Sequence, residues 1–338
     1  MSGAYRRAGV DLKAAGRAVT LIRELAKGAT RPEVLEGVGG FAGLFRIGEG
    51  RYLAAATDGI GTKLDVARMA DRLSTVGIDL VAMCADDVAC TGAEPIFFLD
   101  YLAMGKVAPD DAATIVDGIA EGCRRAGCAL LGGETAEHPG VMGEDQLDLA
   151  GFCVGVVDEE GLIGPRSVRE GDALVGLAST GLHANGYSLV RSAMLAEGPD
   201  VLDAVAEGFD RPLADELLEP TAIYAPLVVS LARGGLVHAA AHVTGGGLPG
   251  NVPRALPDGI GAEIDRGSWP VTPIFDLVRE SASASDEDMF ATFNMGIGMV
   301  LVVPLDRVEE VLARAGDGGT RGYAIGRVVP APGVVFRD

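Results

Sequence analysis

The stretch Thr57-Asp58-Gly59-Ile60-Gly61-Thr62-Lys63 follows an apolar run, Tyr52 to Ala56, that has the length of a β-strand. We therefore predict that the heptad is the loop at the end of that strand. Its two glycines let the backbone approach a ligand closely, and successive N–H groups in such a turn bind anions. Lys63 can add a positive charge for a phosphate. Asp58 can hold the metal ion that accompanies a polyphosphate.

The same heptad is also compatible with a glycine-rich hairpin that carries an exposed ion pair, because short glycine motifs often match by chance. It is not a Walker loop, in which lysine precedes Ser or Thr, since here Thr62 precedes Lys63. The heptad alone does not decide between a phosphate site and a decorated turn, so the rest of the chain has to be considered.

Length and composition predict a two-domain enzyme of the α/β or α+β class. The chain has 338 residues, of which 48% are hydrophobic, 5% are aromatic and 49 are glycine. Its net charge of −20 argues against a nucleic-acid or anionic-membrane surface, both of which need basic patches. No apolar run reaches the roughly 18 residues that span a membrane. Met1 to Arg7 is not followed by the apolar stretch of a signal peptide.

The cysteines indicate a reducing compartment. They form no C-x-x-C pair and have no zinc-binding spacing, and their neighbours are apolar. We expect buried, reduced thiols in a cytoplasmic protein. The five cysteines are Cys84, Cys90, Cys123, Cys128 and Cys153.

Hydrophobic periodicity predicts alternating helices and strands. Helices are expected over 11–28, 78–90, 110–126, 187–195, 221–233, 274–281 and 305–315. Strands are expected over 52–56, 96–101, 128–131, 147–157, 173–178, 261–265, 296–304 and 323–329. Gly, Pro165 and charges cluster between 161 and 171, so we place a domain boundary there, between residues 1–165 and 166–338.

Asp86 and Asp87 lie in an apolar part of the predicted helix 78–90. A carboxylate in such a run is costly to bury unless it is paired or bound to a metal. We expect at least one of the two to be a metal ligand, and the sequence does not say which. Asp79 precedes Asp86 by seven residues, on about the same helical face, and we expect it to lie on a solvated surface.

Four more glycine-rich segments lie near predicted strand ends or helix starts. Gly37 to Gly43 is either a mobile cover for a ligand or a hairpin. Gly132 to Gly140 is predicted to be a loop after the strand 128–131, and it carries Glu134. The other two are Ser179 to Gly186, before a helix, and Thr244 to Gly247.

The side chains near these segments favour an ATP-using enzyme. Asp58, Asp87 and Glu134 offer the oxygen ligands that Mg²⁺ shares with phosphates. Phosphoryl transfer needs mainly positioning and charge neutralisation. No hydrolase or kinase signature is present, and no G-x-G-x-x-G follows the first strand.

Histidines supply the candidates for proton transfer. His183 lies in a loop just before a helix, where it could move a proton or donate to a phosphate. The alternative is that its ring only packs or caps the loop. His138 and His242 occupy other glycine-rich loops and are weaker candidates, and His238 is expected to be structural.

Taken together, the motifs resemble one family, that of phosphoribosylformylglycinamidine cyclo-ligase (AIR synthetase) in the PurM-like ATP-binding superfamily. The resemblance runs from Ala8-Gly9-Val10-Asp11 to the final strand. The matching segments are Asp58–Lys63, Gly77–Cys84, Gly92–Pro95, Phe97–Tyr101, Gly132–Glu137, Gly181–Leu189, Thr244–Gly247 and Phe293–Gly296.

The resemblance implies a two-domain α/β (α+β) architecture. In it, the N-terminal sheets of two subunits pair across a homodimer into a barrel, and the C-terminal domain is an α/β sandwich. It also implies ATP, Mg²⁺ and formylglycinamidine ribonucleotide (FGAM) as ligands. The implied reaction closes FGAM to 5-aminoimidazole ribonucleotide (AIR) and releases ADP and phosphate, in de novo purine biosynthesis.

Carried onto this sequence, the resemblance assigns roles to individual residues. The implied metal ligands are Asp58, Asp87 and Glu134. The implied phosphate contacts are Gly59, Gly61, Thr62 and Lys63, and the implied catalytic residues are His183, Asp58 and Lys63. The implied substrate contacts are Thr135, His183, Asn185, Gly186, Thr244, Gly245, Gly246 and Gly247.

The chain departs from the family pattern in two places. Asp86-Asp87 stands where the family usually has Asn-Asp, which adds a carboxylate. His183-Ala184-Asn185 stands for the usual His-Ser-Asn, which removes a hydroxyl. The alternatives are selenophosphate synthetase, thiamine-monophosphate kinase or a nucleotide-binding module that does not turn over. Selenophosphate synthetase is disfavoured because no reactive Cys or Lys-rich glycine motif lies near the N-terminus.

Overall fold

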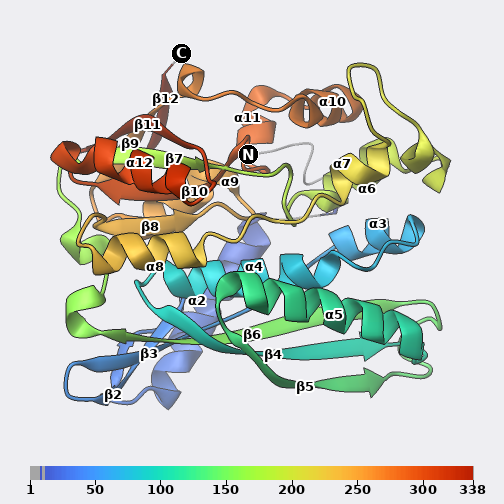
Figure 1. Cartoon of the computed structure of the whole chain (residues 1–338), viewed down its shortest axis with the longest axis horizontal. Coiled ribbons are helices and arrows are strands. Elements are labelled where there is room, and N and C mark those ends of the chain that lie inside the picture. Colours follow the sequence, from blue (N-terminus) through green and yellow to red (C-terminus); the bar gives the residue numbers. More distant parts are fainter. Residues whose placement is uncertain (1–7, 10–11, 338) are drawn as a thin grey trace.

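The computed structural model describes residues 8–9 and 12–337, and these residues form two six-stranded sheets (Figure 1). The first part of the chain contains helix α2 (Leu12–Ala26), strands β1 (Val34–Glu36), β2 (Gly43–Gly48) and β3 (Arg51–Gly59), helices α3 (Lys63–Met69) and α4 (Val76–Ala89), strand β4 (Glu94–Met104), helix α5 (Pro109–Ala126), and strands β5 (Ala129–Glu137) and β6 (Leu147–Asp158).

The second part supplies the other sheet. It contains strand β7 (Ala173–Ala178), helices α6 (Tyr187–Met194), α7 (Leu213–Leu217) and α8 (Ala225–Arg233), strand β8 (Ala239–His242), helix α9 (Gly247–Asn251), strand β9 (Gly261–Asp265), helices α10 (Pro273–Ala282) and α11 (Asp286–Phe290), strand β10 (Ile297–Val303), helix α12 (Val308–Asp317), and strands β11 (Gly322–Val329) and β12 (Gly333–Arg337).

Both sheets are mixed. Their strand orders are β1-β2-β3-β6-β4-β5 and β12-β9-β11-β7-β10-β8. In the first sheet β4 and β5 run parallel and the other pairs are antiparallel. In the second sheet only β9 and β12 run parallel. The proposed boundary at residue 165 falls between β6, the last strand of the first sheet, and β7, the first strand of the second.

Helix α4 lies between the two sheets, where it contacts β3 and β6 of the first sheet and α8 and β8 of the second part (Figure 1). Every residue of α4 except Asp87 is buried. A helix that is apolar on all sides has to be enclosed by other elements. The sequence of α4 is apolar on all sides apart from its three carboxylates, Asp79, Asp86 and Asp87. Those carboxylates therefore have to find partners.

Asp79 finds its partner in a buried ion pair with Lys63, and both side chains also bind residues 219–221 of the second half of the chain. Its Oδ1 accepts a hydrogen bond from Lys63 Nζ at 2.8 Å, and both side chains are fully buried. The same oxygen accepts from the backbone N–H and the hydroxyl of Thr221. The expectation that Asp79 lies on a solvated surface was therefore wrong. Flanking apolar residues enclose the carboxylate, and Lys63 and Thr221 compensate for its burial.

Asp86 caps the start of α8. Its Oδ1 accepts from the backbone N–H groups of Tyr224 at 2.8 Å and Ala225 at 2.7 Å. A carboxylate at a helix N-terminus satisfies free N–H groups and interacts favourably with the helix dipole. Burial nevertheless raises the pKa of Asp86 to about 7. Asp79 and Asp86 thus fix the first half of the chain to residues 221–225 of the second half.

Most predicted elements are confirmed, with two differences that bear on the candidate site. The segment Gly132 to Gly140 was predicted as a loop, but β5 continues through Glu137, so Glu134 lies inside a strand. The heptad is only partly a loop, since β3 continues through Gly59 and α3 begins at Lys63. For Gly37 to Gly43, the hairpin alternative is confirmed, because the segment connects the antiparallel strands β1 and β2. Of the predicted helix 11–28, residue 11 lies outside the described residues.

The five cysteines are free thiols, as predicted. Four of them are buried and Cys128 is partly exposed. Within residues 8–9 and 12–337, no helix combines the length and the apolar character that crossing a membrane requires.

Replacing Lys63 by methionine should destabilise the fold by about 3–5 kcal/mol, because it leaves the Asp79 carboxylate buried without its counter-charge. Urea unfolding measures this change. Lys27→Met is the matched control. Lys27 also pairs with a carboxylate, but both side chains are more than 60% exposed, so its loss should cost at most about 0.5 kcal/mol. If Lys63→Met unfolds at the wild-type urea concentration, the buried ion pair does not stabilise the fold.

Candidate functional site

The carboxylates of Asp58 and Asp87 form the centre of the candidate site. Asp58 lies near the end of β3, where its Oδ1 accepts from the Gly59 N–H at 2.8 Å. Asp87 is the one partly exposed residue of α4, with 14% of its side chain accessible. Burial raises the pKa of Asp58, and the negative charge of Asp87 adds to this effect. Two carboxylates held in mutual repulsion favour the binding of a cation.

This geometry separates the roles of Asp86 and Asp87. Asp86 is fully buried and its Oδ1 is engaged by the start of α8, whereas Asp87 reaches the surface beside Asp58. Adjacent helical residues point about 100° apart, so only one of the two can face the site. The sequence left open whether Asp86 or Asp87 binds the metal ion. Asp87 is the one that is accessible from the surface.

His242, at the end of β8, lies against these carboxylates. Its Nδ1 is 3.0 Å from Asp87 Oδ1, and its Nε2 is buried with no protein partner. Burial lowers the pKa of His242, but the hydrogen bond to Asp87 and the charges of Asp87, Asp86 and Asp58 outweigh it, so the pKa is raised overall. The contact between His242 and Asp87 orients Asp87, and protonation of His242 would partly neutralise the carboxylate pair.

The loop Thr244 to Gly247 continues from β8 and is shaped by Asn251. The buried Asn251 amide donates to the carbonyl groups of Thr244, Gly245 and Gly247 at 2.9–3.2 Å. Asn251 was not among the residues predicted from the sequence. The one signal for it was a polar amide four residues after a glycine run.

Arg254 was also missed, and it connects the loop to the β1–β2 hairpin. Its Nη1 donates to Asn251 Oδ1 at 3.0 Å, and its Nη2 donates to the Gly40 carbonyl at 2.9 Å. The guanidinium lies 3.8 Å from the centre of the Phe41 ring, a cation–π contact. Its charge also acts on Asp58. Arg254 therefore brings a cation to the site of a protein whose net charge is strongly negative.

The two predicted substrate loops lie side by side. A Cβ on Gly245 would be 3.4 Å from Asn185 Oδ1, and Asn185 Nδ2 is 3.8 Å from Met83 Sδ on α4. Gly186 has φ 82°, and a Cβ there would lie 2.1 Å from the Phe293 ring. Gly186 is therefore required by packing, which does not depend on any contact with a substrate.

His183 does not have the environment of a proton donor. Its ring is only 2% exposed, and Nε2 accepts from the Thr180 N–H at 3.2 Å. Burial lowers the pKa of His183 well below its ordinary value, and the charges of His242 and Lys63 lower it further. The neutral ring packs within its loop, and the backbone is left-handed with φ 62°. These features support the alternative that His183 packs or caps its loop over the predicted acid–base role.

The structure contradicts the predicted phosphate contact and catalytic role of Lys63. Its side chain is fully buried, and Nζ is engaged by Asp79 and by the Glu219 carbonyl, each at 2.8 Å. Because α3 begins at Lys63, the side chain turns into the interior instead of following the loop. Thr62 stays half-buried, with Oγ1 3.2 Å from Ser188 Oγ on α6.

Glu134 and Thr135 lie away from this centre. They are exposed on the edge strand β5, whereas Asp58 is on β3, with β6 and β4 in between. Three strand spacings of about 4.8 Å separate β3 from β5 by roughly 14 Å. Within one chain Glu134 therefore cannot share a metal ion with Asp58, which corrects the predicted set of three ligands.

The donor set suits a metal ion that arrives with a ligand. Within the described part of the chain, no cluster of three or more His, Cys, Asp or Glu side chains could hold a metal alone. Mg²⁺ is commonly bound by one or two carboxylates, with phosphate and water oxygens completing the octahedron. Asp58 and Asp87 fit that pattern.

Comparisons with known proteins give matches over both halves of the chain. The family model "AIR synthase related protein, N-terminal domain" matches residues 39–157, and "AIR synthase related protein, C-terminal domain" matches residues 169–338. Among solved structures, thiamine-monophosphate kinase from Stenotrophomonas maltophilia is 21% identical with a TM-score of 0.63, covering 94% of this chain and 95% of that one. Thermotoga maritima PurL complexed with ADP is 18% identical with a TM-score of 0.61, covering 93% and 46%. These two likenesses concern the fold alone.

Curated relatives are much closer in sequence. Phosphoribosylformylglycinamidine cyclo-ligase from Geobacillus kaustophilus is 51% identical over 340 residues, covering 99% of this chain and 98% of the relative. The protein of the same name from Myxococcus xanthus is 51% identical over 337 residues, covering 98% of each. With two matching domain models and this identity over nearly its whole length, the chain belongs to the phosphoribosylformylglycinamidine cyclo-ligase (AIR synthase) family.

Proposed function

We propose that the chain closes the imidazole ring of AIR from FGAM, with ATP converted to ADP and phosphate. The observation that carries this proposal is the pair Asp58 and Asp87, close enough for the charge of Asp87 to raise the pKa of Asp58, where β3 ends and α4 passes between the two sheets. Family membership gives the substrate class, and this pair gives the place where a nucleotide polyphosphate would bind. In this reaction the formyl oxygen of FGAM attacks the γ-phosphate, and a nitrogen of the same molecule then displaces phosphate.

Asp58 and Asp87 would hold Mg²⁺ together with the phosphates of ATP. The ion supplies charge neutralisation at the phosphates. Gly59, Gly61 and Thr62 would offer contacts to the phosphates at the end of β3. His242 holds Asp87 in place through the 3.0 Å contact and limits the repulsion between the carboxylates.

FGAM would bind across the adjacent loops, with Asn185, Gly186 and Thr244 to Gly247 as its contacts. The Asn251 amide fixes three carbonyls of the second loop, so the loop is ordered before any ligand binds. Binding both reacting ends of one molecule on an ordered surface makes ring closure intramolecular and removes much of its entropic cost. The cytoplasmic location expected from the thiols is part of this proposal.

We also propose that the protein is a homodimer in which the first sheets of two subunits pair. Gly151 of β6 faces α4, since a Cβ there would meet Cys84 and Leu80. The next residue, Phe152, therefore points away from α4, and it is 40% exposed, with Tyr101 of β4 41% exposed nearby. Contiguous exposed apolar residues mark interaction surfaces. Pairing would also bring the edge strand that carries Glu134 and Thr135 near a second subunit.

Purified protein with Mg-ATP and FGAM should yield ADP and the aminoimidazole product in equal amounts. A coupled assay for ADP and a colorimetric assay for the aminoimidazole measure the two products separately. ADP formation without the imidazole would indicate another phosphoryl-transfer enzyme. Binding of ATP by calorimetry without turnover would indicate the non-catalytic module instead.

Asp58→Asn should reduce kcat/KM by at least about 100-fold, because the loss of a carboxylate weakens the metal–phosphate site by about 3 kcal/mol. The melting temperature should stay near the wild-type value, since Asn keeps an oxygen for the Gly59 N–H. Asp306→Asn is the matched control, with a side chain 80% exposed in the second part of the chain. Wild-type turnover of Asp58→Asn would refute the metal assignment.

Phe152→Asp should convert the dimer into monomers, because it places two like charges in the interface. Sedimentation velocity measures the change in mass. Leu305→Asp, at a position that is 74% exposed in the second part of the chain, should leave the mass unchanged. A wild-type protein that sediments as a monomer at micromolar concentration would contradict the dimer outright.

A further inference from the structure

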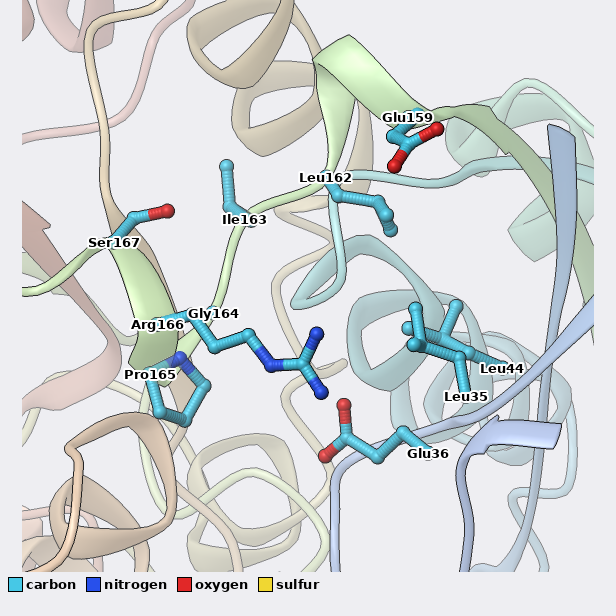
Figure 2. Close-up of a pocket in the computed structure, with 10 residues that line it drawn as sticks. All are labelled: Leu35, Glu36, Leu44, Glu159, Leu162, Ile163, Gly164, Pro165, Arg166 and Ser167. Carbon is cyan, nitrogen blue, oxygen red and sulfur yellow. The ribbon is translucent and has the colours of Figure 1, made fainter. Parts of the chain in front are cut away.

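Two features of the first half of the chain have no assigned part in the proposed reaction. One is a cavity of about 380 Å³ between the β1–β2 hairpin and the segment that connects the two sheets, and Figure 2 shows the side chains that line it. The charge of Arg254 acts on Glu36 in its wall, so this cavity borders the candidate site. The other feature is centred where α5 ends and β5 begins, three strand positions from β3. It is a thiol cluster that consists of Cys123, Cys128 and Cys153.

The end of helix α5 brings Cys123 and Cys128 together. Gly127 has the left-handed φ of 76°, and its N–H donates to the Arg124 carbonyl at 3.3 Å. The Cys128 N–H donates to the Cys123 carbonyl at 3.0 Å. These are the two bonds of a Schellman cap, in which the residue after the glycine commonly packs against the residue five positions before it. A direct backbone hydrogen bond between two residues also keeps their Cα atoms near the roughly 4.4–6.8 Å that a disulfide spans.

Cys153 adds a third thiol from the sheet. It lies on β6, two residues after Gly151, and a Cβ on Gly151 would be 3.0 Å from the Cys84 thiol of α4. Alternate residues of a strand share one face of the sheet, so the thiol cluster lies on the face that the helices cover. The proposed dimer surface, marked by Phe152, is the opposite face. Pairing of two subunits through that surface would therefore leave the thiol cluster uncovered.

The three thiols differ in exposure and in acidity. Cys123 and Cys153 are 2% and 0% exposed, whereas Cys128 is partly exposed. Hydrogen bonds from the Cys123 and Cys153 thiols lower the pKa of Cys128, and the same bonds, together with burial, raise the pKa of the other two. The thiolate is the reactive form of cysteine. Cys128 is therefore the thiol that a small reagent can reach and that ionises most readily.

We propose that Cys128 is a reversible oxidation site that reacts with hydrogen peroxide, and that Cys123 completes a disulfide with it. The Cys128 thiolate attacks one peroxide oxygen and the O–O bond breaks, which leaves a sulfenic acid on Cys128 and a hydroxide that takes up a proton to become water. The Cys123 sulfur then displaces the hydroxyl group of the sulfenic acid, which leaves with the Cys123 proton as a second water. Two thiols are thereby oxidised to one disulfide, and one peroxide is reduced to two waters. A thiol reductant reverses the change.

The strand order favours Cys123 over Cys153 as the partner of Cys128. Strand β4 lies between β6, which carries Cys153, and β5, which begins directly after Cys128. Two strand spacings of about 4.8 Å put β6 and β5 roughly 10 Å apart, and a disulfide does not form without backbone movement when the Cα atoms are more than about 7 Å apart. The disulfide with Cys123 also protects Cys128 from oxidation to sulfinic acid, which thiols do not reduce. Disulfides that occur in a reducing compartment are usually of this transient kind.

Peptide mapping tests this assignment on the unaltered protein. Trypsin cuts at the two arginines between Cys123 and Cys128, so their disulfide joins the peptides 107–124 and 126–166, whereas Cys153 lies within the second peptide. The native protein is exposed briefly to hydrogen peroxide, and its free thiols are then alkylated. Mass spectrometry should find the two peptides joined, and dithiothreitol should separate them. Absence of the joined peptides, or a link between Cys128 and Cys153 inside 126–166, overturns the proposal.

Variants of the thiol cluster separate the roles of its members. Cys153→Ala is the matched control, because it removes a buried thiol of the same cluster and should still give the joined peptides. Cys123→Ala should stop at the sulfenic acid, so that dimedone labels Cys128 at least about tenfold more than in the wild type. Cys128→Ser should keep Cys123 reduced under the same treatment. Loss of the joined peptides in a folded Cys153→Ala, or wild-type labelling in a folded Cys123→Ala, overturns the assignment. No step uses ATP or FGAM, so these outcomes do not depend on the proposed function.

Discussion

The presence of three carboxylates on one helix between the two sheets is the constraint on which this structure depends. Helix α4 is enclosed by both sheets, and charged groups enclosed in this way must be paired or must bind a ligand. Asp79 pairs with Lys63, and Asp86 caps α8. Asp87 is held by His242 and keeps access to the surface. The same helix therefore docks the two halves of the chain and presents one carboxylate to the site.

This arrangement explains why the site lies at the junction of the two halves. The end of β3 brings Asp58 from the first sheet, and the end of β8 brings His242 from the second, with α4 between them. Arg254 and Asn251 then order the neighbouring loops through hydrogen bonds to backbone carbonyls. In the proposed function, a chain with a net charge of −20 would bind polyphosphate here because a metal ion and a few fixed cations would reverse the sign of the field locally.

The sequence pointed to candidate residues where a local motif marked them. It was less informative where a residue's role depended on the direction of its side chain in the folded protein. Asp58 was singled out because it lies beside glycines at a predicted strand end, and the structure places it near the end of β3. Lys63 was misassigned because its position at the start of α3 turns it inward, toward a carboxylate sixteen residues away. Glu134 was expected in a loop, but β5 continues through Glu137 and keeps Glu134 away from Asp58 within one chain. Arg254 was missed because its partners, Gly40 and Asn251, come together only in the folded chain.

The sequence by itself determined the class of fold, the succession of helices and strands and the family, since these follow from hydrophobic periodicity, glycine positions and motif spacing along the chain. Only the tertiary structure decided which carboxylate faces a ligand and which one holds the protein together. Asp79, Asp86 and Asp87 belong to the same residue type on the same helix, and composition cannot separate them. Their roles depend on the direction of each side chain and on the distant donor that it meets, and these are properties of the packed molecule.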